Sequence, residues 1–284
     1  MVRYVVGSLY IFFSVFPIII QSVIVKIFLT YNHFSQHVCY RLMVHVSFFQ
    51  CTMALGYFGL GVFTLSQTVF HRILENFFCV LYDASLYGIH SCTVLIALNR
   101  LVVMGNFFEL KRRFYNVVIA LIWLLFVTYM VLTFTPLLDY TFNHEYAMCS
   151  ITRSHPLRKT YESISYYFVL FTLCFSLLCY LLTAISLTYY RTSGNRNHIK
   201  AAQMRILVIA FIMFVSCGLN LIITHYTGEL FDMRSAAAST LMFVVQFNFG
   251  FLDPIVYVVM NKELREILFK KNRVIKIVTI NSTL

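Results

Sequence analysis

Long runs of apolar residues, separated by short polar segments, dominate the chain. Seven runs are long enough to cross a bilayer as a helix, which takes about 20 residues. These runs are Tyr4–Thr30, Val38–Ser66, Phe77–Met104, Tyr115–Leu138, Ser163–Tyr190, Ile206–Thr227 and Ser235–Met260. The second and seventh are the weakest, because three glycines interrupt one and Asp253 the other. The pattern predicts an all-α membrane protein, a bundle of seven transmembrane helices.

The pattern changes after the seventh run. From Lys262 to Lys271, Leu264, Ile267 and Leu268 recur on one side of a helix, and charged residues occupy the rest. Such a helix is suited to lie on an anionic membrane surface rather than to cross the bilayer. We therefore expect a transmembrane domain over residues 1–260, and an amphipathic helix with a cytoplasmic tail over residues 261–284.

Composition agrees with a membrane protein. The chain of 284 residues is 60% hydrophobic and 12% charged, with a mean hydropathy of +0.78, which does not suit a soluble domain. The net charge of +11 could indicate nucleic acid binding, but the basic residues lie in short segments between apolar runs. Membrane topology therefore explains them better than a nucleic-acid partner.

The distribution of Lys and Arg predicts the orientation. With the N-terminus outside, the inner segments carry fifteen basic residues and the outer segments six, which is the bias that membrane insertion favours. The first run is too long for a secretory signal and lacks a cleavage site, so we expect it to be retained. Only about three residues precede it, so we expect a ligand to bind in the bundle or on its outer loops.

Two polar motifs lie inside apolar runs. Asp253-Pro254 interrupts the seventh run, and Tyr257 follows one turn later on the same helical face. An acid in hydrocarbon indicates a functional site, although a proline-kinked helix with an incidental tyrosine is the simpler alternative. Asn99-Arg100 ends the third run, where an arginine can also extend to the membrane surface without a further role.

Taken together, these motifs resemble those of rhodopsin-like G-protein-coupled receptors. Leu98-Asn99-Arg100, the D-P-I-V-Y segment that runs into V-V-M-N-K-E-L-R, the short N-terminus and the Phe- and Tyr-rich runs resemble most the nematode serpentine chemosensory receptors. The resemblance implies a plasma-membrane receptor, with the sensory cilium as one location, for a small odorant or pheromone-like ligand. It also implies that Arg100 contacts a heterotrimeric G protein, while Asp253, Pro254 and Tyr257 form a switch.

The chain has some of the other features of this family and lacks others. The family has a disulfide between the places of Cys79 and Cys149, so the resemblance implies this bridge, on the oxidising side of the membrane. Trp123 lies where the family usually has a Trp. Asn99 replaces the acid before the Arg, and the fifth and sixth runs lack proline. These losses put the usual activation geometry in doubt.

The ligand site can be predicted only coarsely. Asp83 and Tyr87 share a helical face near the outer end of the third run. Asp83 is a candidate anchor for a cation or polar group, with a competing role as a structural hydrogen-bond acceptor. Amine receptors of the family carry an acid nearer to the position of Tyr82. Further candidates for the walls of the site are Tyr166, Tyr167, His225, Tyr226, Gln246 and Phe247.

Other classes of protein fit the sequence less well. An opsin-like pigment needs a Lys in the seventh run, and Ser235–Met260 has none. An intramembrane aspartyl protease would need Asp83 and Asp253 at the same depth, and their predicted depths differ by about 15 Å. We find no metal-ligand cluster or nucleophile motif, so we expect neither catalysis nor a cofactor. The remaining alternative is a seven-span ligand-gated channel or transporter of inverted topology.

Overall fold

A computed structural model describes most of the first two thirds of the chain and one segment near its end. The described residues are 2–105, 110–132, 134–135, 139–144, 147–151, 156, 158–192, 208, 211, 214–215, 218–219, 255, 258–259 and 262–269. The sixth and seventh predicted spans therefore fall almost wholly outside the description. So do the predicted site residues Asp253, Pro254, Tyr257, His225, Tyr226, Gln246 and Phe247.

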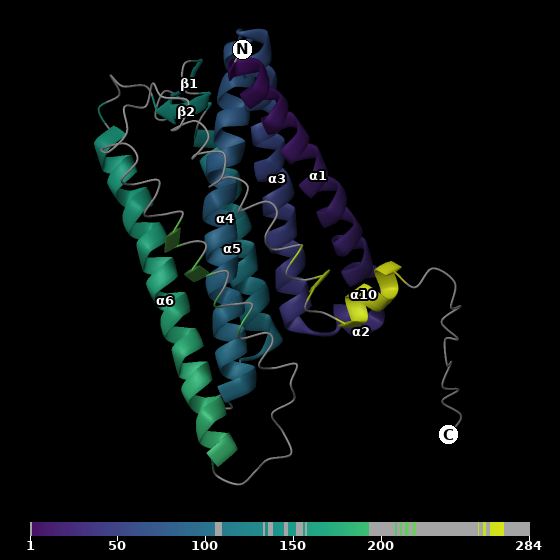
Figure 1. The fold of residues 1–284 in the computed structure, drawn as a ribbon. Helices are drawn as coiled ribbons and strands as arrows, with labels where there is room; N and C mark the ends of the chain where they lie inside the picture. Colours follow the sequence, from purple (N-terminus) through teal and green to yellow (C-terminus); the bar gives the residue numbers. More distant parts are fainter. Residues whose placement is uncertain are drawn as a thin grey trace.

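Five long helices form the described bundle (Figure 1). They are α1 (Val2–Thr30), α3 (Val38–Ser66), α4 (Arg72–Gly105), α5 (Arg112–Leu132) and α6 (Arg158–Thr192). All five are long and apolar enough to cross a membrane. The first five predicted spans are thus confirmed as helices, and a short helix, α2 (Asn32–Ser35), connects α1 to α3.

The helix ends differ from the apolar boundaries. Helix α4 begins at Arg72, five residues before the predicted span, because backbone hydrogen bonding continues into polar residues and Glu75 in the first turn favours a helix N-terminus. Helix α5 ends at Leu132 rather than at Leu138, and Pro136 lies just beyond. Helix α6 begins at Arg158 rather than at Ser163.

Helix α3 lies between α1 and α4, and its glycines allow this close packing. A Cβ on Gly56 would lie 2.9 Å from the backbone nitrogen of Tyr82 in α4. On another face, a Cβ on Gly61 would lie 3.0 Å from the carbonyl oxygen of Gly7 in α1. Small residues at such contacts let helix backbones approach in a membrane. The glycines that weakened the prediction of this span are therefore contact positions between helices.

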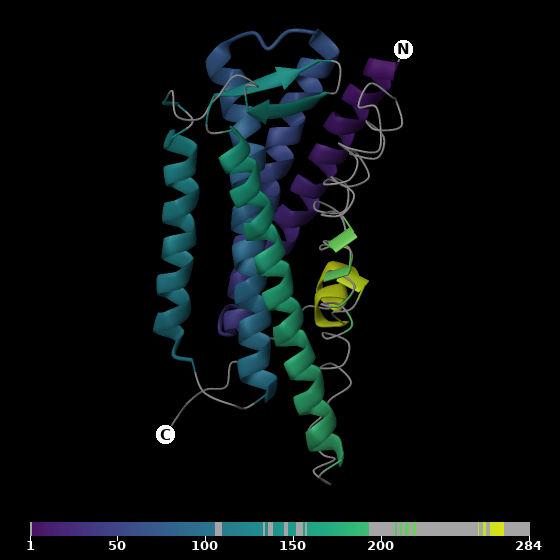
Figure 2. The ribbon, with the colours of Figure 1, turned by 90° about the vertical axis from the view of Figure 1, so that its left-hand side faces the viewer.

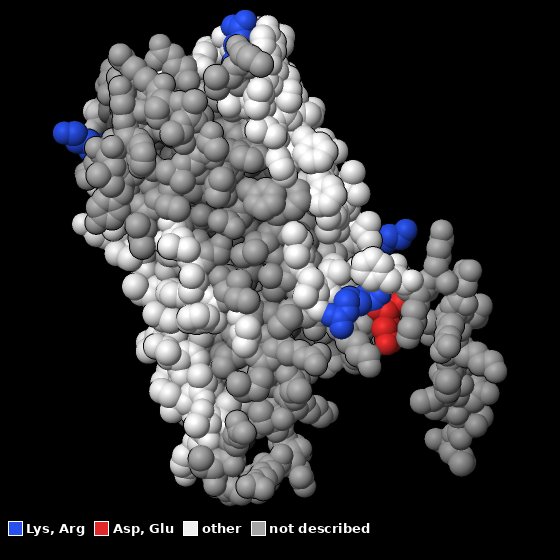
Figure 3. Space-filling model, viewed as in Figure 1, with Lys and Arg blue, Asp and Glu red and all other residues white. Residues whose placement is uncertain are grey.

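The outer surface of the bundle is apolar. Large hydrophobic side chains of α1, among them Phe12, Ile19 and Leu29, are 58–63% exposed. On the face in Figure 3, the coloured charges of described residues lie towards the ends of the bundle and beside α10 (Lys262–Phe269), and α1 is uncharged over much of its length. An exposed apolar band of this length is suited to lipid contact.

A β-hairpin covers the end of the bundle at which α1 begins (Figure 2). Strands β1 (Tyr140–Asn143) and β2 (Met148–Ile151) pair antiparallel, with Phe142 opposite Cys149. The sequence analysis did not predict these short strands, which lie in the segment between the fourth and fifth spans. We call this end of the bundle the hairpin end.

Helix α10 packs near the opposite end of α1. Leu264 is fully buried there, in an apolar cluster with Ile24, Phe28 and Phe34 of α1 and α2. Phe269 is 73% exposed, so the helix has one buried and one open side. This arrangement agrees with the amphipathic pattern of the sequence.

Candidate functional site

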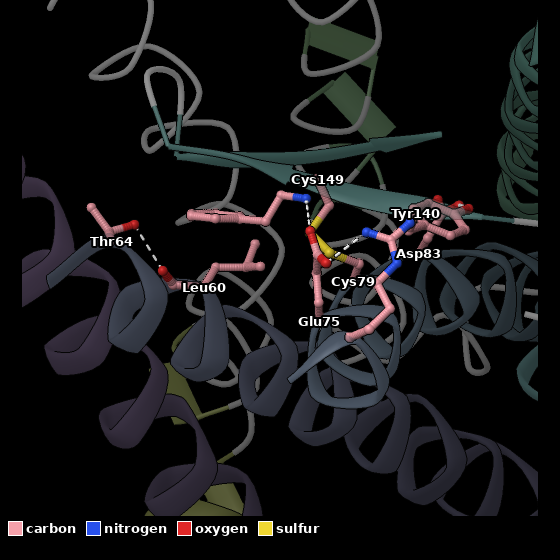
Figure 4. Close-up of a disulfide and its surroundings, with 9 residues drawn as sticks. Leu60, Thr64, Glu75, Cys79, Asp83, Tyr140 and Cys149 are labelled. Atoms are coloured by element: carbon pink, nitrogen blue, oxygen red, sulfur yellow. Dashed lines mark hydrogen bonds and ion pairs between the residues drawn. A yellow bond between two sulfur atoms is a disulfide. The ribbon is translucent and has the colours of Figure 1, made fainter. Parts of the chain in front are cut away.

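One face of α4 carries most of the polar contacts at the hairpin end. Arg72, Glu75, Cys79 and Asp83 follow one another at intervals of three, four and four residues, which places them on one side of the helix. Figure 4 shows Glu75, Cys79 and Asp83 of α4 beside Tyr140 and Cys149 of the hairpin. Each of the four residues contacts the hairpin or the segment that leads into it.

The covalent contact is a disulfide between Cys79 and Cys149. Their Cα atoms are 5.5 Å apart, and Cys79 is fully buried. The bond joins α4 to β2 across 70 residues of chain. This is the pair that the family resemblance implies, and it fixes the hairpin over the end of the bundle.

Glu75 provides an ionic contact one turn above the disulfide. Its carboxylate accepts a hydrogen bond from the backbone N–H of Phe142 at 2.6 Å and another from Arg72 at 2.7 Å. Arg72 also donates to Asp139, just before β1. Glu75 is 4% exposed, and in the described structure Arg72 thus bridges a buried and an exposed carboxylate.

Asp83 accepts hydrogen bonds from three tyrosines one turn below the disulfide. Tyr129 of α5 donates to its Oδ2 atom at 2.8 Å, and Tyr140 of β1 and Tyr161 of α6 donate to the same oxygen. Tyr87 of α4 donates to the Tyr161 hydroxyl at 2.8 Å. One carboxylate therefore connects α4, α5, α6 and the hairpin. We call Asp83, Tyr87, Tyr129, Tyr140 and Tyr161 the Asp83 cluster.

The aromatic rings of the Asp83 cluster also pack on one another. The rings of Tyr129 and Tyr161 stack with their centroids 6.1 Å apart and an interplanar angle of 29°. The ring centroids of Tyr87 and Tyr129 are 5.5 Å apart. Phe168 continues the group at 5.2 Å from Tyr87. Such pairs add stabilisation beyond the burial of their area.

Tyr140 remains a hydrogen-bond donor in this arrangement. Burial raises the pKa of its phenol well above the usual range, and the negative charge of Asp83 raises this pKa further. The neutral hydroxyl therefore keeps its proton at physiological pH. Its bond to Asp83 holds the first residue of β1 against the bundle.

The predicted ligand residues divide into two groups. Asp83 and Tyr87 lie together as predicted from helical spacing, and Asp83 acts as a hydrogen-bond acceptor. Tyr166 is half-buried and packs edge-on against Tyr167, which is 65% exposed on α6. Tyr82, at the spacing of amine receptors, instead packs on Tyr57 of α3, with ring centroids 4.8 Å apart.

Sequence reasoning missed Tyr129, Tyr140 and Tyr161. They belong to three separate elements, and the sequence does not show that these elements meet at Asp83. Tyr129 lies in an apolar run that is typical of any membrane helix, and Tyr161 lies in the polar segment just before the fifth predicted span. The one available signal was Asp83 itself, because a carboxylate in an apolar run needs several donors.

The predicted coupling residues lie towards the other end of α4. Asn99 is 4% exposed and Arg100 is half-buried. The side chain of Arg100 lies near the Cys39 thiol of α3. Nearby, Arg41 of α3 donates to Asn116 of α5 at 3.2 Å. These contacts join the ends of α3, α4 and α5 opposite the hairpin.

Two polar residues of α3, His45 and Gln50, are hydrogen-bonded to neighbouring helices. The indole of Trp123 in α5 donates to His45 at 3.2 Å, and Gln21 of α1 donates to Gln50. The Gln21 and Gln50 side chains are at most 1% exposed. Buried polar groups of this kind require partners, so these bonds help to fix the relative positions of α1, α3 and α5. Across the described ranges, no three His, Cys, Asp or Glu residues are grouped to hold a metal ion.

Comparison with known proteins gives a structural match. No model of a protein family matches the chain, and no curated protein is similar to it in sequence. The crystal structure of squid rhodopsin is similar in fold, with a TM-score of 0.77 and 13% sequence identity. The match covers 93% of this chain and 83% of the rhodopsin chain. The chain therefore has a fold like that of squid rhodopsin.

Proposed function

We propose that the protein is a chemosensory G-protein-coupled receptor. A small external molecule, odorant or pheromone-like, binds in the outer half of the bundle, and a heterotrimeric G protein is activated at the inner end. The observation that carries this proposal is the hairpin that a disulfide and the Asp83 cluster fix over one end of a rhodopsin-like bundle. Polar groups that converge beneath such a cover suit the capture of a small ligand.

The disulfide also supports the proposed orientation. Disulfides persist on the extracellular side of the membrane and are rare in the cytosol. The bond between Cys79 and Cys149 lies at the end where α1 begins, so this end faces outward in the proposal. The bias of Lys and Arg in the sequence supports the same orientation independently. An inverted channel or transporter would place the disulfide in the cytosol, which disfavours that alternative.

Signalling in the proposal is a shift between two states of the bundle. A ligand favours the inner-open state only through its higher affinity for that state. Arg100 then contacts the G protein, and Asp253, Pro254 and Tyr257 re-pack as the switch. Because Asn99 cannot pair with Arg100 as a carboxylate would, we expect the adjacent Cys39 thiol to take part in restraining Arg100.

Sidedness is the first test. We would place a glycosylation sequon beside Arg153, in the segment between the hairpin and α6, and extend the tail so that Asn281 becomes a usable acceptor. Glycosidase-sensitive modification beside Arg153 alone is the expected result. Modification at Asn281 alone would show that the topology is inverted, and the channel or transporter would then be the leading hypothesis.

Arg100→Ala tests the G-protein step. We expect this variant to lose recruitment of Gα subunits, measured by energy transfer in cells, while its surface expression stays at the wild-type level. Arg113→Ala is the control, because Arg113 is an exposed arginine at the start of α5, at the same end of the bundle. If the Arg100→Ala variant recruited Gα subunits as well as the wild type does, Arg100 would have no role in the G-protein step.

A further inference from the structure

Two arginines lie close together where α3 and α5 meet, at the end of the bundle opposite the hairpin. Arg41 of α3 donates to the Oδ1 atom of Asn116 in α5 at 3.2 Å, and Arg112, one turn before Asn116, lies near Arg41. Arg41 also lies near His45, which follows it by one turn on α3. Like charges at short range repel each other, so the fold brings the two arginines together at a cost in free energy.

Positive charge prevails around this pair. Among the described residues, neither arginine forms an ion pair with a carboxylate. Lys111 and Arg113 flank Arg112 and are exposed, and the one acid of the adjoining segment, Glu109, lies outside the described residues. With Arg41, these four basic residues and one acid carry a net charge of +3. Helix α10 has two basic and two acidic residues, so it adds no net charge at this end. An anion from outside the chain would compensate the pair.

The groups that line this contact are mainly hydrogen-bond donors. The indole of Trp123 in α5 donates to the Nδ1 atom of His45 at 3.2 Å, so a neutral His45 carries its own proton on Nε2. Each guanidinium has five N–H donors, and the described acceptor for Arg41 is the Asn116 side chain. We call Arg41, His45, Arg112, Asn116 and Trp123 the α3–α5 seam. An anion with several oxygens suits such a set of donors.

The length of α5 places the seam at the depth of lipid headgroups. Its 21 residues span about 32 Å, close to the thickness of the hydrocarbon core. Arg112, the first residue of α5, therefore lies at the membrane surface, and Asn116 lies about 6 Å deeper. Phe48 of α3 is 49% exposed and packs on Trp123 with ring centroids 4.9 Å apart. These rings provide an apolar surface further into the bilayer.

We propose that the α3–α5 seam binds an anionic phospholipid, with its phosphate between Arg41 and Arg112 and an acyl chain along Phe48. Guanidinium groups suit a phosphate because they can donate two parallel hydrogen bonds to its oxygens. In the proposed orientation the seam faces the cytoplasmic leaflet, which is the leaflet rich in anionic lipid. A sterol has no charge to compensate the two arginines. The inference goes beyond the proposed function and shares with it only the orientation of the chain.

The test is native mass spectrometry of the purified full-length protein, titrated in detergent with lipids that carry the same acyl chains. The probes are phosphatidylserine, phosphatidylinositol 4-phosphate and phosphatidylcholine. We expect at least one of the anionic lipids to bind about tenfold more tightly than phosphatidylcholine. Equal binding of all three lipids would overturn the proposal. Glycerol 3-phosphate, which has a phosphate and no acyl chain, should not displace the lipid at equal concentration. Displacement by it would make a soluble anion the ligand and would overturn the assignment to a lipid.

Two neighbouring variants separate a site from a general attraction of charge. Arg112 and Arg113 are both exposed, and Arg112 is the one that lies near Arg41. We expect Arg112→Gln to weaken the binding of the anionic lipid about tenfold, and Arg113→Gln to weaken it by no more than about twofold. Both changes are at the surface, where substitutions have little effect on folding. Equal weakening by the two variants would show that net charge alone attracts the lipid, and would overturn the site.

Discussion

Glu75 and Asp139 provide a matched test of what holds the hairpin in place. Both carboxylates accept from Arg72, but the side chain of Glu75 is 6% exposed and that of Asp139 is 39% exposed. Glu75 also accepts the backbone N–H of Phe142, a residue that is itself 6% exposed. Glu75→Ala therefore removes a buried ionic contact to Arg72, and Asp139→Ala removes an exposed ionic contact to the same arginine.

The two costs follow from burial. Glu75→Ala leaves a buried N–H without its acceptor and removes a charge-assisted bond, which together cost about 2–4 kcal/mol. Asp139→Ala removes a half-exposed ion pair, which costs about 0–1 kcal/mol after screening by solvent. For a chain of this size, the first change corresponds to a fall in melting temperature of about 5–10 °C.

Thermal unfolding of the purified protein in nanodiscs measures this difference. The wild type, both single variants and the double variant are compared at low and high salt, because only the exposed pair is strongly screened. Glu75→Ala should unfold at the lower temperature at either salt concentration. Equal melting temperatures for Glu75→Ala and Asp139→Ala would refute the reasoning that the buried contact anchors the hairpin.

Three further predictions concern packing, the disulfide and pH. Gly56→Ala should lower the melting temperature because its Cβ would meet the α4 backbone, and Gly218→Ala, which has open space around it, is the control. Cys79→Ser and Cys149→Ser should lose surface expression to the same extent, and the double variant should be no worse than either. Because the folded pKa of Tyr140 is raised, its stabilising contribution is fully present below the ordinary tyrosine pKa and is lost only as pH rises through the raised value. Melting temperatures measured from pH 6 to 9 should therefore show the same pH dependence for the wild type and Tyr140→Phe.

The helices could be predicted from the sequence because each is a property of a continuous segment. An apolar run of 20 or more residues must satisfy its backbone internally in a bilayer, so hydropathy alone predicts α1, α3, α4, α5 and α6. The helix ends were less accurate, since α4 begins five residues before the predicted span, in a segment with the polar residues Arg72, Glu75 and Asn76. The hairpin is short and its strands carry no comparable signal, so its position became clear only in the structure.

Only those residues of the candidate site that lie on the same helix could be predicted to lie together. Asp83 and Tyr87 share a face of α4 by spacing alone, and the sequence predicted them together. Tyr129, Tyr140 and Tyr161 join them from α5, β1 and α6, and this meeting depends on how separate elements pack. Among nineteen tyrosines, no local pattern distinguishes these three.

The arrangement of α4 constrains how a ligand could act at a distance. Asp83 and Arg100 are 17 residues apart on this helix, which corresponds to about 25 Å. The disulfide holds α4 to the hairpin covalently, whereas α6 is joined to Asp83 through the hydroxyl of Tyr161. Further along, Leu101 of α4 packs with Cys179 of α6, close to Arg100. In the proposed receptor, a ligand that displaced the Tyr161 hydroxyl would therefore remove one of the contacts between α6 and α4, and a resulting shift of α6 would reach the surroundings of Arg100 by packing.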